Sequence, residues 1–257
     1  MVEPVLQCTD VCMSFGGVKA VDTFSMTLNP GEIRGIIGPN GAGKTTIFNV
    51  LSRIYQQDAG SITFKGQCID EKDQITVARM GLARTFQNIR LFSGLSVLEN
   101  VKVSLDYAGK YSFFEAMFLL PRRFKQEKLT TERASKCLEV LNLEQYAALR
   151  PANLAYGLQR RVEIARALVC EPSVLLLDEL AAGLNPEEVF ELIDFIKQIK
   201  KLYPHIAILV IEHRMDLIMN LCEYLYVQNF GTTIAEGTPS EIQTNDAVLS
   251  AYLGEEE

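Results

Sequence analysis

Nine consecutive residues have the types and spacing of a phosphate-binding loop. The stretch matches the pattern GxxxxGK[ST] and comprises Gly38, Pro39, Asn40, Gly41, Ala42, Gly43, Lys44, Thr45 and Thr46. Glycines at these positions free the backbone to curl until successive N–H groups point at one anion. Lys44 adds a positive charge for the β- and γ-phosphates, and Thr45 offers its hydroxyl to Mg²⁺. The motif therefore predicts that the chain binds a nucleotide together with magnesium.

The residues on either side place this loop between a strand and a helix. Residues 33–37 are mostly apolar, which predicts a buried strand. Downstream, apolar residues recur at i, i+3, i+4 and i+7 of one helix face, namely Ile47, Val50, Leu51 and Ile54. A chance glycine-rich turn is the alternative interpretation. Because strand, loop and helix follow in the required order, we favour the phosphate-binding interpretation.

Two carboxylates end an apolar run in the second half of the chain. Residues 174–177 are apolar and are followed by Asp178 and Glu179, which predicts a strand buried on both faces of a parallel sheet. Asp178 would hold Mg²⁺, directly or through water, and Glu179 would polarise a water for attack on a γ-phosphate. Alone, such a strand end is an ordinary solvated edge. Its pairing with the phosphate loop favours the catalytic interpretation.

A third motif precedes the carboxylate strand. Residues 154–168 predict a turn that leads into a helix, with Val162, Ala165 and Leu168 along one stripe. Here the chain resembles the ATP-binding subunits of ABC transporters, whose signature is LSGGQ followed by QRV. The positions that agree are Leu154, Gly157, Gln159, Arg160 or Arg161, and Val162. The positions that depart are Ala155, Tyr156 and Leu158.

Other residues take roles through this resemblance. In the family, an aromatic residue at the position of Phe15 stacks on adenine. Gln87 fits the loop whose amide touches Mg²⁺ or water, residues 181–185 fit the D-loop, and His213 fits the switch histidine. Core packing is the alternative for Phe15, and Phe24 competes with it for the adenine role.

His213 also has a physical argument of its own. It falls just past the apolar run at 206–211, which predicts another buried strand. Sheets of α/β proteins place ligand-contacting residues at such carboxyl ends. An imidazole there can contact the γ-phosphate, so strand and spacing favour this role over that of a satisfied surface or core histidine.

The departures from the family pattern bear on turnover. The resemblance implies that Ala155 and Gly157 meet the ATP of a partner subunit. Ala155 lacks the usual serine hydroxyl, but the following helix still offers backbone donors and a favourable dipole, so we expect weaker capture and not its loss. Leu158 replaces a glutamine, and Leu180 replaces a proline, which restores an N–H and loosens the local φ restraint. Every charged group of the mechanism is present, so we expect ATP hydrolysis.

Composition narrows the kind of protein. The 257 residues can hold one large α/β domain or two small ones, and 48% are hydrophobic, which is ample for a core. The net charge of −7 argues against nucleic acid as a partner. Six cysteines without a CxxC pair predict reduced, mostly structural thiols, and only two histidines argue against a transition-metal site. No stretch approaches the roughly 18 apolar residues of a membrane span, and no signal peptide is recognisable, so we expect a cytoplasmic protein.

Helix-capping and helix-breaking residues, together with the resemblance to ABC ATPases, predict an α/β fold of the P-loop NTPase (RecA-like) kind. Residues 1–86 and 160–257 would form a parallel-sheet nucleotide-binding core with an N-terminal antiparallel β region. Residues 87–159 would form an inserted helical subdomain that carries the signature. Helix starts are predicted at the capping box Ser96–Glu99 and at the N-caps Asn185 and Thr238, each followed by proline.

A finer resemblance singles out one branch of the family. Residues 83–92, 154–157, 181–186 and 251–254 are similar to the larger ATP-binding subunit of bacterial branched-chain amino acid importers. This implies head-to-tail docking with a second ATPase subunit, identical or related, with ATP between the two. It also implies transmembrane permeases, indirectly a solute-binding protein, and a peripheral place on the inner face of the cell membrane. ATPases of urea or amide importers and of lipopolysaccharide exporters are similar and remain alternatives.

Two stretches offer surfaces for partners. Ile89, Leu91 and Phe92 follow the position where family members receive a permease helix, and core packing explains them equally well. Residues 111–125 are apolar and then basic, which fits a membrane-proximal or partner-binding helix or a plain insert.

Functions of other classes are less favoured. ABC ATPases of translation or DNA repair normally carry two cassettes or a long coiled-coil insertion, and this chain has neither. A P-loop kinase would need a lid and an acceptor site, and kinases lack the signature. A nonenzymatic binding module draws support only from Leu158 and Leu180.

Overall fold

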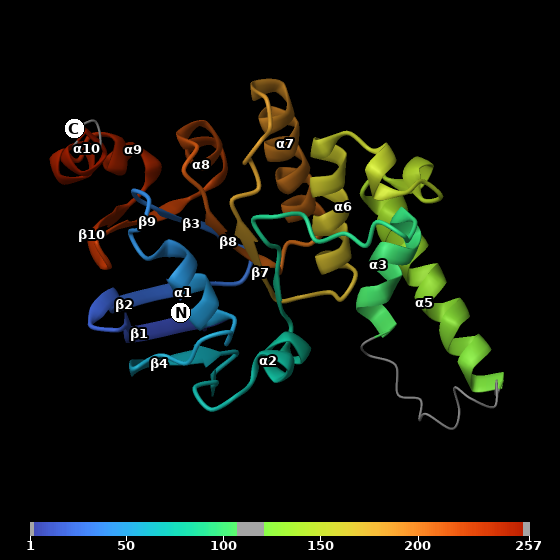
Figure 1. Ribbon diagram of the computed structural model, residues 1–257, viewed down its shortest axis with the longest axis horizontal. Helices are drawn as coiled ribbons and strands as arrows, with labels where there is room; N and C mark the ends of the chain where they lie inside the picture. The colour runs from blue at the N-terminus through green and yellow to red at the C-terminus, as the bar shows by residue number, and fades with distance from the viewer. Residues whose placement is uncertain (1–2, 107–120, 254–257) are drawn as a thin grey trace. The chain divides into compact units, whose positions relative to one another are not determined.

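The computed structural model describes residues 3–106 and 121–253, and the chain divides into two compact units (Figure 1). The first unit consists of Met1–Gln87 and Ser173–Glu257, and the second of Asn88–Pro172. The boundary that the sequence suggests between 159 and 160 falls inside helix α6 (Tyr156–Leu168), which lies entirely in the second unit. Because helical hydrogen bonds run unbroken across that point, the unit ends only after the helix.

The first unit contains two sheets. The antiparallel sheet has the strand order β2-β1-β4-β5, with β1 (Leu6–Phe15), β2 (Val18–Leu28), β4 (Ala59–Phe64) and β5 (Gln67–Cys68). The other has the order β10-β9-β3-β8-β7-β6, with β3 (Ile33–Ile37), β6 (Leu82–Arg84), β7 (Val174–Asp178), β8 (Ala207–Ile211), β9 (Tyr224–Asn229) and β10 (Thr232–Gly237). All its neighbouring strands pair in parallel except β9 and β10. The predicted antiparallel region and parallel sheet are therefore confirmed.

The register of the parallel strands aligns their carboxyl ends at one edge of the sheet. Ile36 of β3 and Asp178 of β7 both pair with Ile211 of β8. Every residue of β7 and β8 is buried, as expected for strands covered on both faces. The phosphate loop, the two carboxylates and His213 consequently follow strands that end at one edge of the sheet.

The helices of the first unit are α1 (Lys44–Leu51), α2 (Gln74–Met80), α7 (Pro186–Leu202), α8 (Met215–Leu221), α9 (Pro239–Gln243) and α10 (Asp246–Leu253). Helix α1 buries Ile47, Val50 and Leu51 in one apolar cluster with side chains of both sheets. Ile54, predicted on the same helix face, lies beyond the end of α1 and is 38% exposed. The reason is Arg53, whose left-handed conformation (φ 60°) does not continue a helix.

The described elements of the second unit are helices. They are α3 (Val97–Asp106), α5 (Pro121–Val140), α6, and the 3₁₀ helices η1 (Glu144–Tyr146) and η2 (Pro151–Asn153). The predicted capping box before α3 is confirmed, because the Ser96 N–H donates to Glu99 Oε2 at 2.7 Å and the Glu99 N–H donates to Ser96 Oγ at 3.2 Å. Of the apolar and basic stretch noted above, residues 111–120 lie outside the described residues.

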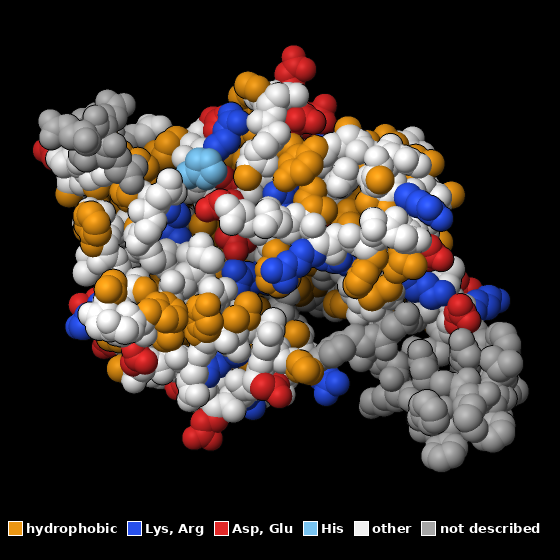
Figure 2. All heavy atoms as spheres, viewed as in Figure 1, with side chains coloured by type: hydrophobic (Ala, Val, Ile, Leu, Met, Phe, Trp, Pro, Cys, Tyr) orange, Lys and Arg blue, Asp and Glu red, His pale blue; other side chains and the backbone are white. Residues whose placement is uncertain are grey.

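The predicted N-caps of the first unit are also confirmed. Asn185 caps α7 and Thr238 caps α9, each in a reciprocal capping box with a glutamate and with proline at the first turn. Among the helices of residues 3–106 and 121–253, none is both long and apolar enough to pass through a bilayer. On the face drawn in Figure 2, Lys and Arg side chains are interspersed with Asp and Glu side chains, so this face offers both signs of charge.

The cysteines provide a test of the packing. Burial raises the pKa of Cys8 and of Cys137 to about 12, which disfavours the reactive thiolate. Cys68 and Cys170 are both exposed, but desolvation raises the pKa of Cys170 as well. We therefore expect Cys68→Ser to remove the fastest-reacting thiol in labelling with Ellman's reagent. The control Cys8→Ser should leave that fast phase unchanged, and loss of the fast phase in the control would contradict the packing described here.

Candidate active site

The phosphate loop joins β3 to α1 in a conformation that needs glycine at two points. Gly38 has a φ of 147°, and a Cβ there would lie 2.0 Å from the carbonyl oxygen of Gln228. Gly43, with a φ of 98°, is the N-cap of α1, and a Cβ there would lie 2.1 Å from the carbonyl oxygen of Ala20. The loop therefore has no room for side chains where it presses on β2 and β9.

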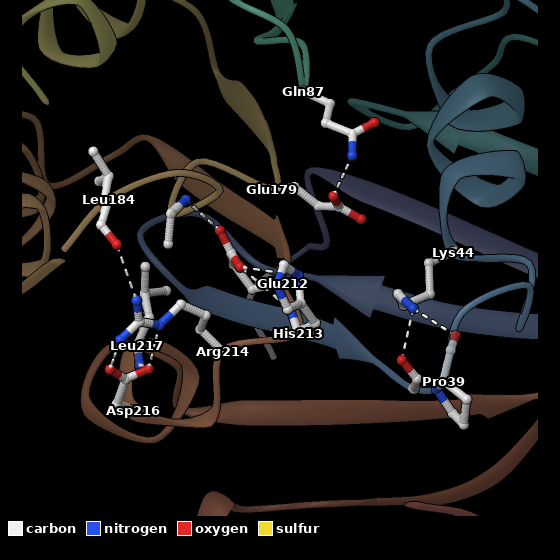
Figure 3. Close-up of polar contacts among 12 residues, drawn as sticks. Pro39, Lys44, Gln87, Glu179, Leu184, Glu212, His213, Arg214, Asp216 and Leu217 are labelled. Carbon is white, nitrogen blue, oxygen red and sulfur yellow. Dashed lines mark hydrogen bonds and ion pairs between the residues drawn. The ribbon is translucent and has the colours of Figure 1, made fainter. Parts of the chain in front are cut away.

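Lys44 lies within the curl of this loop. Its Nζ donates to the carbonyl oxygens of Gly38 and Pro39 at 2.6 and 2.7 Å, as Figure 3 shows for the lysine and the loop. Lys44 is 6% exposed, whereas Thr45, the next residue of α1, is exposed. The ammonium and the first N–H groups of α1 thus gather positive charge where an anion would bind.

Asp178 ends β7 with its carboxylate buried. The residue is 2% exposed, and its Oδ2 accepts a hydrogen bond from Arg84 Nη2 at 2.7 Å. Its Oδ1 has no hydrogen-bond partner in the described part of the chain. A buried carboxylate oxygen without a donor fits a hard cation, and Mg²⁺ is typically held by one or two protein oxygens together with substrate phosphates. Asp178 and the hydroxyl of the exposed residue Thr45 therefore fit magnesium.

Glu179 and Gln87 contact each other beside Asp178. Gln87 Nε2 donates to Glu179 Oε2 at 2.5 Å (Figure 3). Glu179 has a φ of 44°, uncommon for a residue with a side chain, and its N–H donates to the carbonyl of Ile211 at 2.9 Å. The following residue, Leu180, is 1% exposed, so its side chain packs in the core. These contacts hold the glutamate in a turned-out conformation directly after the strand.

Glu212 connects this turn to the predicted switch histidine. Its side chain is fully buried, its Oε1 accepts the Ala181 N–H at 2.6 Å, and its Oε2 accepts the His213 N–H at 3.2 Å. Burial raises the pKa of Glu212, although the Ala181 N–H acts in the opposite direction. Half of the His213 side chain is exposed, and Figure 3 shows it beside Glu212. Glu212 was not predicted from the sequence, where its only signal is that a charged residue follows a fully apolar strand.

The aromatic residue expected to face adenine is accessible. Phe15 ends β1, is 44% exposed, and meets Tyr55 edge to face with 5.4 Å between the ring centroids. The competing Phe24 is fully buried in the core. Of Phe15 and Phe24, only Phe15 is open to a ligand, which favours its assignment to the adenine. Tyr55 is a second aromatic residue at this place, and the sequence spacing did not reveal it.

The signature residues belong to the second unit. Ala155 is the N-cap of α6, makes no side-chain capping bond and is exposed, and Gly157 lies in the first turn. Behind them, Tyr156 Oη accepts a hydrogen bond from Arg160 Nη2 at 3.0 Å, and Arg160 Nη1 donates to Glu163 Oε2 at 3.2 Å. Burial raises the pKa of Glu163, and the charge of Arg160 opposes that shift. A buried ion pair, which the sequence did not predict, thus lies in the helix that follows the signature turn.

Comparison with known proteins decides the family. Residues 21–182 match the family model described as ABC transporter, a span that contains the phosphate loop, the signature and both carboxylates. The chain belongs to the ABC transporter family. The predicted family is therefore confirmed, and the chain is an ABC-type ATPase.

Other comparisons cover nearly all of this ABC ATPase. Residues 232–257 match a family model described as branched-chain amino acid ATP-binding cassette transporter. The high-affinity branched-chain amino acid transport ATP-binding protein LivG of Escherichia coli (strain K12) is 42% identical, over 99% of this chain and 100% of that protein. The probable branched-chain amino acid transport ATP-binding protein LivG of Methanocaldococcus jannaschii is 32% identical, over 98% of each. A solved structure of a nucleotide-free ATP-binding cassette from an ABC transporter gives a TM-score of 0.84 at 30% identity and covers 97% of this chain and 99% of that one.

The phosphate loop can be tested at a glycine. We expect Gly38→Ala to lower ATP affinity roughly tenfold or more, because its Cβ would meet the Gln228 carbonyl and its φ is strained for alanine. Equilibrium dialysis with radiolabelled ATP measures the affinity. Gly94→Ala is the control, since a Cβ at Gly94 meets nothing within 4 Å. Equal affinities for the two variants would disprove the role given to this loop.

Proposed function

We propose that this ABC ATPase powers the import of branched-chain or other hydrophobic amino acids through a membrane permease. The similarity to LivG extends over the whole chain, including the C-terminal segment that matches the branched-chain amino acid family. That full-length similarity is the observation that carries the solute class. The arrangement of the first unit supports the chemistry that supplies the energy.

In the proposed reaction, the loop and the N-terminus of α1 receive the phosphates of ATP, and Lys44 adds charge against the β- and γ-phosphates. Thr45, Asp178 and Gln87 would hold Mg²⁺. The ion supplies positive charge where negative charge develops on the transferred phosphoryl group. Glu179 accepts a proton from the attacking water while the Gln87 amide keeps the carboxylate in place. His213 donates to the γ-phosphate.

The proposal includes a second ATPase subunit. The exposed N-terminus of α6, with Ala155 and Gly157, would meet the ATP bound to a second subunit, either a copy of this chain or a related one. Phe15 would stack on the adenine. Because each ATP then lies between two subunits, hydrolysis would release them from each other and drive the permease.

The remaining partners follow from the transport role. The chain would sit on the cytoplasmic face of the cell membrane against permease subunits, and a solute-binding protein would act indirectly. Phe92 is 53% exposed, while Ile89 and Leu91 are half-buried. The loop that carries Phe92 is held by Asn100, whose Oδ1 accepts the Phe92 N–H at 2.7 Å. This fixed, partly apolar loop supports a permease contact after Gln87.

Hydrolysis is tested by Glu179→Gln. We expect the purified variant to bind ATP with nearly wild-type affinity and to lose nearly all phosphate release, because an amide cannot accept the proton of the attacking water. Glu132→Gln makes the same chemical change at an exposed glutamate and is the control. An unchanged rate in Glu179→Gln would remove this residue from the role of base.

The solute class is tested by uptake in cells. A strain that lacks this chain should take up radiolabelled leucine slowly, and wild-type and Glu132→Gln genes should restore uptake while Glu179→Gln should not. Normal leucine uptake in the deletion strain, together with a defect in urea uptake or in lipopolysaccharide delivery, would replace the amino acid assignment and leave the ATPase chemistry intact.

A further inference from the structure

A buried arginine touches the carboxylate that is proposed to hold magnesium. Arg84 ends β6, and its Nη2 donates to Asp178 Oδ2 at 2.7 Å. The side chains of Arg84 and Asp178 are 7% and 3% exposed. Removal of one partner from such a buried ion pair leaves an uncompensated charge, so the two groups depend on each other.

The other end of the guanidinium is tied to the helix of the phosphate loop. Arg84 Nη1 donates to Asn49 Oδ1 at 2.8 Å and to Ser52 Oγ at 3.0 Å. Asn49 lies in α1, and Ser52 caps its C-terminus. Arg84 therefore joins the helix that begins with Lys44 to the strand that ends with Asp178.

Two aromatic rings restrict the guanidinium further. Its central carbon lies 5.5 Å from the ring centroid of Phe48 and 5.4 Å from that of Phe86. Such contacts favour a planar cation over a compact ammonium. With hydrogen bonds at both terminal nitrogens and rings nearby, Arg84 is held in one orientation.

The two carboxylate oxygens of Asp178 differ in their hydrogen bonding. Oδ2 is occupied by Arg84, whereas Oδ1 has no partner in the described residues. Carboxylates that bind metals are commonly held by a hydrogen bond of this sort, and loss of such a supporting partner typically lowers metal affinity about 10- to 100-fold.

We propose that Arg84 is a positioning residue for magnesium: it holds Oδ2 of Asp178 and leaves Oδ1 to the metal of the bound nucleotide. The inference rests on the proposed function, because it requires that Asp178 holds Mg²⁺. Gln87, whose amide contacts Glu179, follows the end of β6 by three residues. In this proposal Arg84 acts through Asp178 and does not touch the reacting atoms.

The variant Arg84→Lys tests whether the planar guanidinium of Arg84 is needed or only its positive charge. Lysine keeps the positive charge, but its single ammonium cannot serve Asp178 and Asn49 in the same planar geometry. The probe is the nonhydrolysable ATP analogue AMP-PNP, whose affinity is measured in excess Mn²⁺ and again in EDTA. We expect the gain in affinity that Mn²⁺ provides to fall roughly tenfold or more in Arg84→Lys, with little change in EDTA. The electron paramagnetic resonance spectrum of the bound Mn²⁺ should change as well.

Three further variants complete the experiment. Asp178→Asn removes the negative charge of the proposed metal ligand and should lose most of the Mn²⁺ gain. Arg34→Lys is the matched control, because Arg34 also has a carboxylate partner, Glu32 at 2.8 Å in the same unit, and its other hydrogen bonds go to Thr27 and Tyr226. Asn49→Ala keeps the Arg84–Asp178 pair but removes one anchor, so it should lower the gain less than Arg84→Lys does. If Arg84→Lys fails to fold, Asn49→Ala still tests whether anchoring of the guanidinium affects metal affinity.

The variants test the role of Arg84 separately from the metal site at Asp178. A wild-type Mn²⁺ gain in Arg84→Lys and Asn49→Ala, with loss in Asp178→Asn, would reduce Arg84 to a buried counter-charge and overturn the inference. Equal losses in Mn²⁺ and in EDTA would overturn it too, since they indicate a structural role. A wild-type gain in Asp178→Asn would instead refute the metal site of the proposed function.

Discussion

The buried carboxylate of Asp178 imposes the strongest physical constraint on this molecule. A charge with 2% exposure at the end of a strand covered on both faces is stable only when it is paired. Arg84 supplies that pairing for one oxygen only. The guanidinium must in turn be held, and the polar groups of Asn49 and Ser52 hold it. The helix that follows the phosphate loop and the strand that ends in Asp178 are thereby fixed relative to each other.

The parallel register brings the residues of the proposed active site to one edge of the sheet. Because Ile36 and Asp178 share Ile211 as a partner, β3 and β7 end at the same level on either side of β8. The chain then has to turn sharply at that edge, which it does through Gly38 and through the left-handed conformation of Glu179. Glycine adopts its conformation at Gly38 without strain. At Glu179 the strained backbone is held by the Ile211 carbonyl and, two residues later, by the Glu212 carboxylate.

Those parts of the fold and of the candidate site that lie in short contiguous motifs could be predicted from the sequence. The phosphate loop, the apolar strand before Asp178 and the cap at Asn185 each carry their physical reason within a few residues, so sequence sufficed for them. The pair of Arg84 with Asp178 joins positions 94 apart, and Glu212 reaches Ala181 across 31. Such contacts depend on strand order and register, which no local pattern encodes. The end of α1 before Ile54 was missed for the opposite reason, since one residue's conformation overrode a helical pattern.

If the phosphate loop and the two carboxylates form one metal-dependent nucleotide site, a crystal structure of the protein with AMP-PNP and Mn²⁺ will show it, with the metal located by its anomalous scattering. We expect the phosphates within the loop of residues 38–46. We expect the metal between the Thr45 hydroxyl and Oδ1 of Asp178, with the Arg84 bond to Oδ2 intact. Nucleotide bound outside that loop, or a metal remote from both Thr45 and Asp178, would contradict this expectation.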